Sequence, residues 1–333
     1  MRYLADYVWI GGRQELRSKV RVMDGELEMD VSRYPDWNYD GSSTGQAKGN
    51  DSEVIVKARK VYRDPFRENG VIVLCDTYLP DGTPHVTNNR FRANEIFERG
   101  LDKKPWFGLE QEYFLMDVKT EKPIGHYREP IEQGQYYCSV GGRNSFGRHI
   151  VDEHLDACLR ANLRVSGVNG EVAPAQWEFQ IGPAEGIEAG DDMWIARYLL
   201  EKITEKYGVY VDWEPKPIEG DVNGSGCHCN FSTVEMREND NGLKLIEQAI
   251  DRLATNHEEH MRNYGSGNER RMTGLHETAS YDSFSYGRAN RGSSVRIGNQ
   301  TIDEGKGYFE DRRPASNCDP YLVTSMIFAT TSL

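Results

Sequence analysis

Four short segments of the chain alternate apolar residues, many of them aromatic, with polar residues at the two-residue period of a β-strand. The segments span residues 109–115, 176–181, 227–232 and 307–313. Their polar positions carry glutamate and histidine rather than lysine and threonine. Because alternate side chains of a strand point to opposite faces, each segment is expected to have one apolar face and one polar face.

The acidic positions of these strands predict a metal site. Glu110 and Glu112 share a face, with their Cα atoms roughly 6–7 Å apart, which is two steps of strand rise. A solvent-exposed face is the alternative for any single strand, but four such strands in one sheet would line a cavity. Carboxylates in a cavity repel one another unless cations lie between them, and oxygen ligands with one imidazole suit Mg²⁺ or Mn²⁺. The candidate ligands are Glu110, Glu112, Glu178, His228 and Glu310, with Glu171 from the adjoining loop.

The cysteines do not favour a zinc site. Cys227 and Cys229 flank His228, so in a strand both thiols point away from the imidazole. The 6 cysteines are scattered along the chain, which favours reduced thiols in a cytosol-like compartment over a disulfide framework.

Arginines form a second cluster, between residues 270 and 313. The chain has 40 Lys and Arg against 53 Asp and Glu, a net charge of −13, so this cluster is a local excess. Ion pairs on a solvated surface are the alternative, but arginine binds anions with two donors, and arginines beside carboxylate-held metals are typical of phosphoryl transfer. The acidic charge argues against nucleic acid and anionic membranes as partners.

The 333 residues are enough for two domains, and the pattern favours an α+β fold. Strands are predicted at 7–10, 19–23, 54–61 and 71–75. Helices are predicted at 92–101, 146–162, 191–207, 243–264 and from Asp319-Pro320 to about Ala329. The domains are predicted to be residues 1–84 and 85–333. Neither of the common glycine-rich phosphate-binding motifs is present, so a nucleotide would need another kind of site.

Several segments resemble the glutamine synthetase family, of the eukaryotic-type short-subunit class, in order and spacing over nearly the full length. They are residues 37–44, 106–113, 169–183, 223–228, 274–278, 290–292 and 309–314. The resemblance implies a small N-terminal β-grasp domain and a larger catalytic domain with a curved antiparallel sheet flanked by helices. It also implies ATP-dependent ligation of ammonia to the side-chain carboxylate of L-glutamate, through a γ-glutamyl phosphate.

The same resemblance implies a role for each matching residue. One metal ion is implied on Glu112, Glu171 and Glu178, and a second on Glu110, His228 and Glu310. Glutamate is implied to bind at Asn223, Gly224, His228, Arg271, Arg291 and Arg312. ATP is implied to bind at Trp106, Glu178, Pro183, Asn230, Ser232, Arg291, Arg296 and Tyr308.

The resemblance also implies how ammonium is bound and used. The ammonium pocket would contain Asp40, Ser43, Tyr137 and Glu171. Asp40 would accept a proton from ammonium, Arg291 would contact phosphate groups, and Glu277 would lie on a mobile flap that excludes water.

The family forms rings, so the resemblance implies a homo-oligomer, usually a decamer of two pentamers, in the cytoplasm. The turn-rich, polar loop at residues 37–44, which bears Asp40, would complete the site of the neighbouring subunit. A loop that serves its own chain is the alternative.

Rival functions are a ligase for a larger amine, a catalytically silent relative and a metal-dependent nuclease. The predicted ammonium pocket, the complete set of metal ligands and the acidic charge argue against these in turn.

Overall fold

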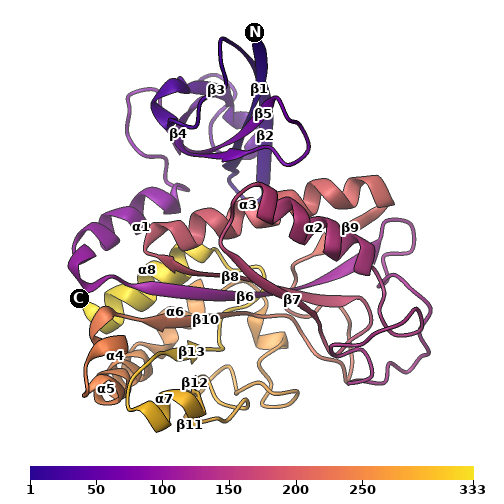
Figure 1. Cartoon of the computed structure of the whole chain (residues 1–333), viewed down its shortest axis with the longest axis vertical. Helices are drawn as coiled ribbons and strands as arrows, with labels where there is room; N and C mark the ends of the chain where they lie inside the picture. The colour runs from indigo at the N-terminus through magenta and orange to yellow at the C-terminus, as the bar shows by residue number, and fades with distance from the viewer. The chain divides into compact units, whose positions relative to one another are not determined.

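The computed structural model describes residues 1–333, which divide into two compact units (Figure 1). One unit comprises residues 1–95 and 156–163, and the other comprises residues 96–155 and 164–333. Two sheets and a set of helices make up the chain, so the predicted α+β class is confirmed. None of the helices combines the length and the apolar character needed to cross a membrane.

The N-terminal sheet has five strands in the order β2-β1-β5-β4-β3. The strands are β1 (Arg2–Ile10), β2 (Leu16–Asp24), β3 (Trp37–Asp40), β4 (Glu53–Arg63) and β5 (Gly70–Tyr78). Only the β1–β5 pair is parallel. The central strand β5 is buried along its whole length because its sequence is a nearly continuous apolar run. The four strands predicted in this region fall within β1, β2, β4 and β5.

The segment at residues 37–44 is more ordered than the predicted loop. Trp37 begins the edge strand β3 and packs edge-to-face on Tyr7, with the ring centroids 5.4 Å apart. A single turn of 3₁₀-helix, η2 (Gly41–Thr44), follows, and the Asp40 carboxylate accepts a hydrogen bond from the Ser42 N–H at 3.0 Å. Strand pairing on one side and an N-cap on the other therefore fix the position of Asp40 in this unit.

The second unit contains an eight-stranded sheet in the order β11-β12-β13-β10-β6-β8-β7, with β9 also paired to β6. Its strands are β6 (Trp106–Asp117), β7 (Val165–Gly170), β8 (Gln176–Glu185), β9 (Val209–Asp212), β10 (Cys227–Ser232), β11 (Tyr286–Arg288), β12 (Val295–Ile297) and β13 (Phe309–Asp311). Every pair is antiparallel except β11 with β12. The four polar-faced segments predicted from the sequence are β13, β10, β6 and β8, which are neighbours in this sheet. The last of them along the chain is shorter than predicted, since β13 ends at Asp311.

The apolar face of this sheet packs against helices. Phe107, Phe231 and Phe309 lie opposite one another on β6, β10 and β13, with ring centroids 5.1 and 5.6 Å apart. α3 (Ile187–Thr204) packs on β8 and β6, and α8 (Pro320–Ser332) packs on β10 and on α3 (Figure 1). With one face covered in this way, the polar side chains of the same strands point to the other face.

Most of the remaining helices lie close to predicted ones, but the short helices at 234–238 and 299–304 were not predicted. The remaining helices are α1 (Asn89–Glu98), α2 (Arg148–Arg160), α4 (Val234–Glu238), α5 (Gly242–Thr255), α6 (His257–Asn263) and α7 (Asn299–Glu304). The helix predicted at 243–264 is broken between α5 and α6 at Asn256. The Asn256 side chain donates to the Arg252 carbonyl at 2.9 Å, which shows how asparagine competes with the backbone for helix carbonyls. At α8, Asp319 accepts from the Tyr321 N–H, and Pro320 occupies the first turn, as predicted.

Candidate active site

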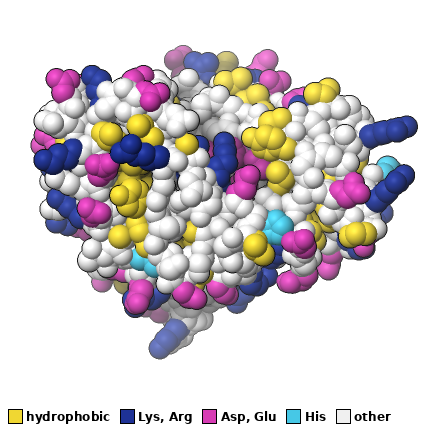
Figure 2. Space-filling model, turned by 90° about the horizontal axis from the view of Figure 1, so that it is seen from below, with side chains coloured by type: hydrophobic (Ala, Val, Ile, Leu, Met, Phe, Trp, Pro, Cys, Tyr) yellow, Lys and Arg dark blue, Asp and Glu magenta, His cyan; other side chains and the backbone are white.

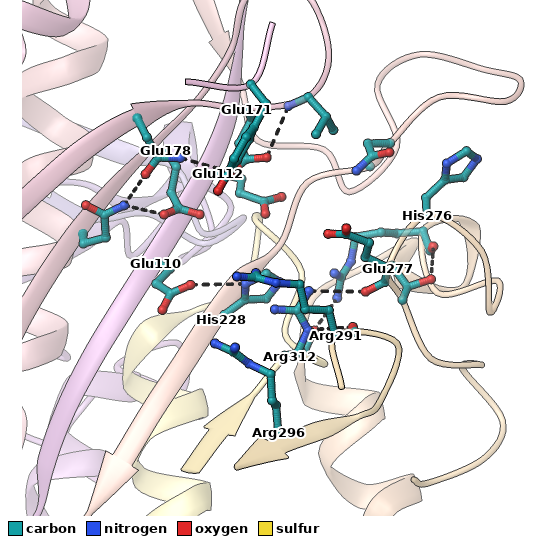
Figure 3. A pocket seen from close by; sticks show the side chains of 18 residues that line it. Glu110, Glu112, Glu171, Glu178, His228, His276, Glu277, Arg291, Arg296 and Arg312 are labelled. Atoms are coloured by element: carbon teal, nitrogen blue, oxygen red, sulfur yellow. Dashed lines mark hydrogen bonds and ion pairs between the residues drawn. The ribbon is translucent and has the colours of Figure 1, made fainter. Parts of the chain in front are cut away.

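Strand register places the predicted metal ligands opposite one another. His228 on β10 lies opposite Glu110 on β6, and Glu178 on β8 lies opposite Glu112 on β6. Directly opposed residues of antiparallel strands project from the same face, so all four side chains point to the uncovered face. They line a pocket of about 540 Å³. Figure 2 shows acidic side chains gathered in a hollow of the surface beside basic ones, and Figure 3 shows the pocket from close by.

The pocket brings the carboxylates into two overlapping groups. One ligand atom from each member lies within 4.8 Å of the others in the group Glu112, Glu171 and Glu178 and in the group Glu110, Glu178 and His228. Glu178 belongs to both. Glu310 is not in the second group, but its Oε1 atom is 3.6 Å from Nδ1 of His228. Hard oxygen ligands, one imidazole and this close spacing fit divalent cations such as Mg²⁺ or Mn²⁺.

Electrostatics in the pocket favour an added positive charge. Burial and the charges of Glu112 and Glu110 raise the pKa of Glu178 to about 9. Burial and the charge of Glu112 raise the pKa of Glu171 to about 8. Each carboxyl therefore resists ionisation when buried beside its neighbours, and a divalent cation would favour the ionised form of both.

Glu110 behaves differently from these two carboxyls. Burial disfavours its ionised form, but hydrogen bonds from His228 and Asn230 outweigh burial and lower the pKa of Glu110 to about 2. The Asn230 amide donates to Glu110 at 2.8 Å, and Nδ1 of His228 is 3.5 Å from the other carboxylate oxygen. Glu110 is therefore held as a carboxylate even without a cation.

Hydrogen bonds fix the orientation of the other acidic side chains. The Gly226 N–H donates to Glu112 at 2.7 Å, and the Asn169 amide donates to Glu171 at 3.1 Å. The Gln180 amide donates both to Glu178 and to Asn169. Asn169 and Gln180 were not among the predicted site residues. Gln180 could have been found, because it lies on the polar face of the segment 176–181.

Arginines cover the opposite side of the pocket. Glu310 is paired with Arg312 at 2.7 Å and with Arg296, which lies directly opposite it on β12. Arg271 is buried, and its guanidinium donates to Asn268 and to carbonyl oxygens of residues 312–314. Burial lowers the pKa of Arg271 to about 10, so the group keeps its charge at neutral pH. A pocket with carboxylates on one side and arginines on the other can hold cations and anionic substrates together.

The residues predicted to bind glutamate all line this pocket. They are Asn223, Gly224, His228, Arg271, Arg291 and Arg312. The flap candidate Glu277 also lines it, together with His276 and Thr278, which sequence reasoning did not single out. In Figure 3, His276 points away from Glu110 and Glu178.

The residues predicted to bind ATP fall into two sets. Glu178, Arg291 and Arg296 line the pocket, whereas Trp106, Pro183, Asn230, Ser232 and Tyr308 do not. Trp106 lies opposite Ser232 in the β6–β10 pair, and the Arg237 guanidinium stacks 3.9 Å from the centre of the indole ring. Arg237 also donates to the Ser232 hydroxyl at 3.0 Å. Sequence reasoning missed Arg237, because nothing in a single sequence indicates which side chain stacks on Trp106.

The four predicted ammonium-binding residues are also divided. Tyr137 and Glu171 line the pocket, but Asp40 and Ser43 do not. The Asp40 carboxylate accepts hydrogen bonds from the hydroxyls of Ser42 and Ser43 at 2.6 and 2.7 Å, and these bonds lower its pKa to about 2. Asp40 is therefore an exposed carboxylate that stays ionised.

Comparisons with known proteins show the family of the chain. The family model described as glutamine synthetase, catalytic domain, matches residues 90–244. The chain is 55% identical to glutamine synthetase cytosolic isozyme 1-3 of Arabidopsis thaliana, over 100% of this chain and 95% of that protein. It is 56% identical to a putative glutamine synthetase of Acanthamoeba polyphaga mimivirus, over 98% of this chain and 93% of that protein. It is also 56% identical to the chloroplastic glutamine synthetase of Brassica napus, over 100% of this chain and 78% of that protein. Such similarity over nearly the whole length shows that the chain belongs to the glutamine synthetase family.

Proposed function

We propose that the pocket binds ATP, L-glutamate and ammonium and produces L-glutamine, ADP and phosphate. The observation that carries this proposal is the meeting of two overlapping acidic groups with Arg271, Arg291, Arg296 and Arg312 in one pocket. A carboxylate is a poor electrophile, and phosphorylation of its oxygen makes the carbonyl carbon reactive. The pocket needs cation sites and anion sites side by side for that step, because it must offset the charge of a nucleotide and of glutamate at once.

Two or more divalent cations, Mg²⁺ or Mn²⁺, are proposed as cofactors. Glu112, Glu171 and Glu178 would hold one cation, and Glu110, His228 and Glu310 would hold another, with Glu178 near enough to take part in both sites. Cations held there would supply positive charge to the phosphate groups of ATP. The raised pKa values of Glu171 and Glu178 support this assignment, because they reveal acidic groups short of positive partners.

Glutamate is proposed to bind on the arginine side of the pocket, with Arg271 and Arg312 as its main anion partners. Both guanidinium groups are positioned by bonds to the protein backbone: Arg312 donates to the Arg291 carbonyl at 3.0 Å, and Arg271 to the Arg313 carbonyl at 2.8 Å. The Asn223–Gly224 backbone and His228 complete the proposed glutamate site. Groups fixed in this way lose little freedom when the substrate binds.

ATP is proposed to extend from the arginines towards Trp106. Arg291, Arg296 and Glu178 lie at the phosphate end of this path. Trp106, Pro183, Asn230, Ser232 and Tyr308 lie at the base end of the proposed path. Asn230 joins the two ends, since its side chain bonds Glu110 in the pocket and it is the residue two before Ser232 on β10.

In the proposed reaction, an oxygen of the glutamate side-chain carboxylate attacks the γ-phosphorus of ATP, and ADP leaves. Ammonium is attracted to carboxylates and then loses a proton to Asp40, and ammonia attacks the carbonyl carbon as phosphate departs. Arg291 would contact the transferred phosphate. Ser43, Tyr137 and Glu171 would bind ammonium beside Asp40, and Glu277 would keep water from the acyl phosphate.

Asp40 and Ser43 are proposed to act in the site of a neighbouring subunit, within a cytoplasmic ring that is a decamer of two pentamers. The support is that the pocket of each chain is lined by residues between 110 and 312, without Asp40 or Ser43. Several of the similar proteins are named cytosolic isozymes, which supports the location.

Co-expression tests the shared site. The Asp40→Ala and Arg312→Ala variants should each be nearly inactive alone, because each destroys one half of every site. Mixed rings contain some interfaces with an intact Asp40 and an intact Arg312, so they should recover a fraction of wild-type activity. Mixed rings with no recovery would show that each site is built within one chain, and light scattering of the same samples would give the ring size.

The activity itself is tested with the purified chain. Phosphate and glutamine should form in equal amounts, and only when ATP, Mg²⁺ or Mn²⁺, glutamate and ammonium are all present. A panel of alkylamines in place of ammonium separates this function from ligation of a larger amine. Faster turnover with an alkylamine than with ammonium would contradict the proposal.

A further inference from the structure

The loop that carries Glu277 is held in an unusual backbone conformation. Residues Thr273 and Ser280 form a bridge that closes the base of this loop, which we call the 273–280 loop. At its tip, His276 and Glu277 both have positive φ angles, of 52° and 59°. Neither residue has the freedom of glycine, so this conformation persists only where contacts from outside the loop support it.

The tip separates two hollows. One is the active-site pocket of about 540 Å³, and the other is a neighbouring hollow of about 470 Å³ that reaches Ile131, Gln133 and Asp221. His276 and Glu277 line both hollows. Movement of the tip would therefore open the active-site pocket towards the second hollow and its water.

One side-chain contact joins the tip to a different part of the chain on the side of the second hollow. Nε2 of His276 lies 2.7 Å from Oδ1 of Asp221, so the imidazole N–H donates to the carboxylate. Two further contacts join the loop to residues outside it: the Arg312 guanidinium donates to the Glu277 carbonyl at 3.3 Å, and the Thr278 hydroxyl donates to the Arg271 carbonyl at 3.2 Å. Arg312 already belongs to the active site, whereas Asp221 does not line that pocket.

Asp221 is exposed, but the turn that carries it is firmly anchored. The Gln133 side chain donates to the Asp221 carbonyl at 2.9 Å and accepts from the Asn223 N–H at 3.2 Å. Between them, Val222 is buried in a cluster with Phe114 and neighbouring apolar side chains. The Asp221 carboxylate thus projects from a fixed base, although 93% of its side chain is accessible.

We propose that Asp221 and His276 are positioning residues that tether the tip of the 273–280 loop to the turn at 221–224. This proposal rests on the proposed function, because Asn223 and Gly224 of the same turn are the residues proposed to bind glutamate. The tether links the glutamate site to the loop that shields the acyl phosphate. Without the tether the tip opens more often, and water attacks the acyl phosphate to give glutamate and phosphate, so ATP is consumed without formation of glutamine.

The test compares three variants of the full-length protein. Asp221→Ala removes the acceptor, and Asp221→Asn keeps an acceptor oxygen but removes the charge. Glu219→Ala is the matched control, since it removes an exposed carboxylate from the same segment that makes no hydrogen bond to the loop. The readouts are phosphate released per glutamine formed, and hydrogen exchange of the backbone amides of residues 274–279.

Loss of one hydrogen bond of this kind should raise the open population about two- to tenfold. Asp221→Ala should therefore speed exchange in residues 274–279 by that factor and release more phosphate than glutamine. Asp221→Asn should lie between Asp221→Ala and wild type, and Glu219→Ala should match wild type. Glu277→Ala serves as the positive control for uncoupling.

Two results would overturn the proposal. Unchanged exchange in Asp221→Ala would show that no tether holds the tip. A one-to-one ratio of phosphate to glutamine despite faster exchange would show that the tether does not protect the intermediate. A double-variant cycle adds a check, because His276→Ala should not speed exchange further once Asp221 is replaced. If wild type made no glutamine at all, the proposed function would fail, and exchange alone would still decide whether the tether exists.

Discussion

Two acid–arginine pairs occupy adjacent positions in one stretch of chain. Glu310 pairs with Arg312 at 2.7 Å, and Asp311 pairs with Arg313 at the same distance. Arg312 lines the active-site pocket, whereas Asp311 and Arg313 are completely buried in the core. Because side chains alternate between the two faces of a strand, one ion pair lies at the pocket and the other lies in the core.

In the core pair, Asp311 and Arg313, almost every polar atom of the side chains has a hydrogen-bond partner. Arg313 donates to both oxygens of Asp311, at 2.8 and 2.7 Å, and the Tyr264 hydroxyl donates to Asp311 at 2.9 Å. The third nitrogen of the guanidinium lies 3.1 Å from Nδ1 of His257. Burial would raise the pKa of Asp311, but the charge of Arg313 outweighs it and lowers that pKa below the ordinary value.

The pocket pair, Glu310 and Arg312, lies among acidic side chains that have too few positive partners. Arg296 and Arg312 share Glu310, and nearby Glu171 and Glu178 have pKa values raised to about 8 and 9. The comparison teaches that a buried ion pair with complete partners makes the fold depend on keeping both charges together. Where the charges are left unbalanced, as in the pocket, the arrangement suits the cations and phosphate groups proposed to bind there.

The largest expected effect comes from breaking the core pair. Arg313→Met should lower the free energy of unfolding by about 3–5 kcal/mol, because Asp311 would remain buried without its partner. Urea or thermal unfolding measures the loss. The double variant Asp311→Leu with Arg313→Met should be less destabilised than the single one, since no charge is left unpaired. A loss below about 1 kcal/mol in Arg313→Met would show that the pair is not structural.

Breaking the Glu310–Arg312 pair, or removing the neighbouring His228, should affect turnover rather than folding. Glu310→Gln and His228→Ala should each reduce glutamine formation about a hundred- to a thousandfold, because each weakens the proposed second metal site. Thermal unfolding should still be cooperative, and titration with Mn²⁺ should show weaker binding than in wild type. Near-normal turnover in both variants would contradict the metal assignment.

Removal of the metal should make the stability of the protein depend on pH, because Glu171 and Glu178 then lack a positive partner. The pKa values of Glu171 and Glu178 in the folded, metal-free protein lie above the ordinary 4.5, so the folded state binds more protons than the unfolded state between pH 4.5 and about 9. Stability of the chelator-treated protein should therefore fall as pH rises through this range, by at least about 2 kcal/mol between pH 6 and pH 8.

Mg²⁺ should reverse this loss, so the stabilisation it gives should be greater at pH 8 than at pH 6. Glu178→Gln serves as the control, because it removes one of the two groups and should flatten the curve. A metal-free protein whose stability is constant over this range would show that these carboxyls are not short of positive partners.

The smallest effect on stability is expected for an acid–arginine pair that is exposed to solvent. Glu258 and Arg262 lie four residues apart on α6, with their atoms 3.6 Å apart and both side chains exposed. Arg262→Ala should change the free energy of unfolding by less than about 0.5 kcal/mol. If Arg262→Ala lowered the free energy of unfolding as much as Arg313→Met, burial would not explain why the pairs differ in their contribution to stability.

Local patterns were enough to predict four of the eight strands of the larger sheet, β6, β8, β10 and β13, whereas β7, β9, β11 and β12 were not predicted. The two-residue alternation in 109–115 and 176–181 identified β6 and β8, because aromatic residues on one face and glutamate on the other suit a strand that covers a core on one side only. The break at Asn256 was missed, since a side chain that bonds its own helix leaves the apolar periodicity of 243–264 intact. The domain boundary between residues 84 and 85 stays a prediction.

The candidate site was predicted less completely. The alternation shows which face a side chain takes, but the register that places His228 opposite Glu110 depends on long-range pairing that no local pattern contains. For that reason the sequence did not reveal that Glu178 belongs to both acidic groups. Supporting residues such as Asn169 and Arg237 were missed because their partners are fixed by the folded chain and not by a local pattern.

The central claim is that the pocket phosphorylates the side-chain carboxylate of glutamate before ammonia is joined to it. The most direct measurement uses L-glutamate labelled with ¹⁸O in that carboxylate, together with ATP, Mg²⁺ and ammonium, and follows the phosphate released by mass spectrometry. We expect one labelled oxygen in each phosphate, because the carboxylate oxygen that attacks the γ-phosphorus leaves with it. Phosphate without the label would show that water, not glutamate, accepts the phosphoryl group, and would contradict this claim.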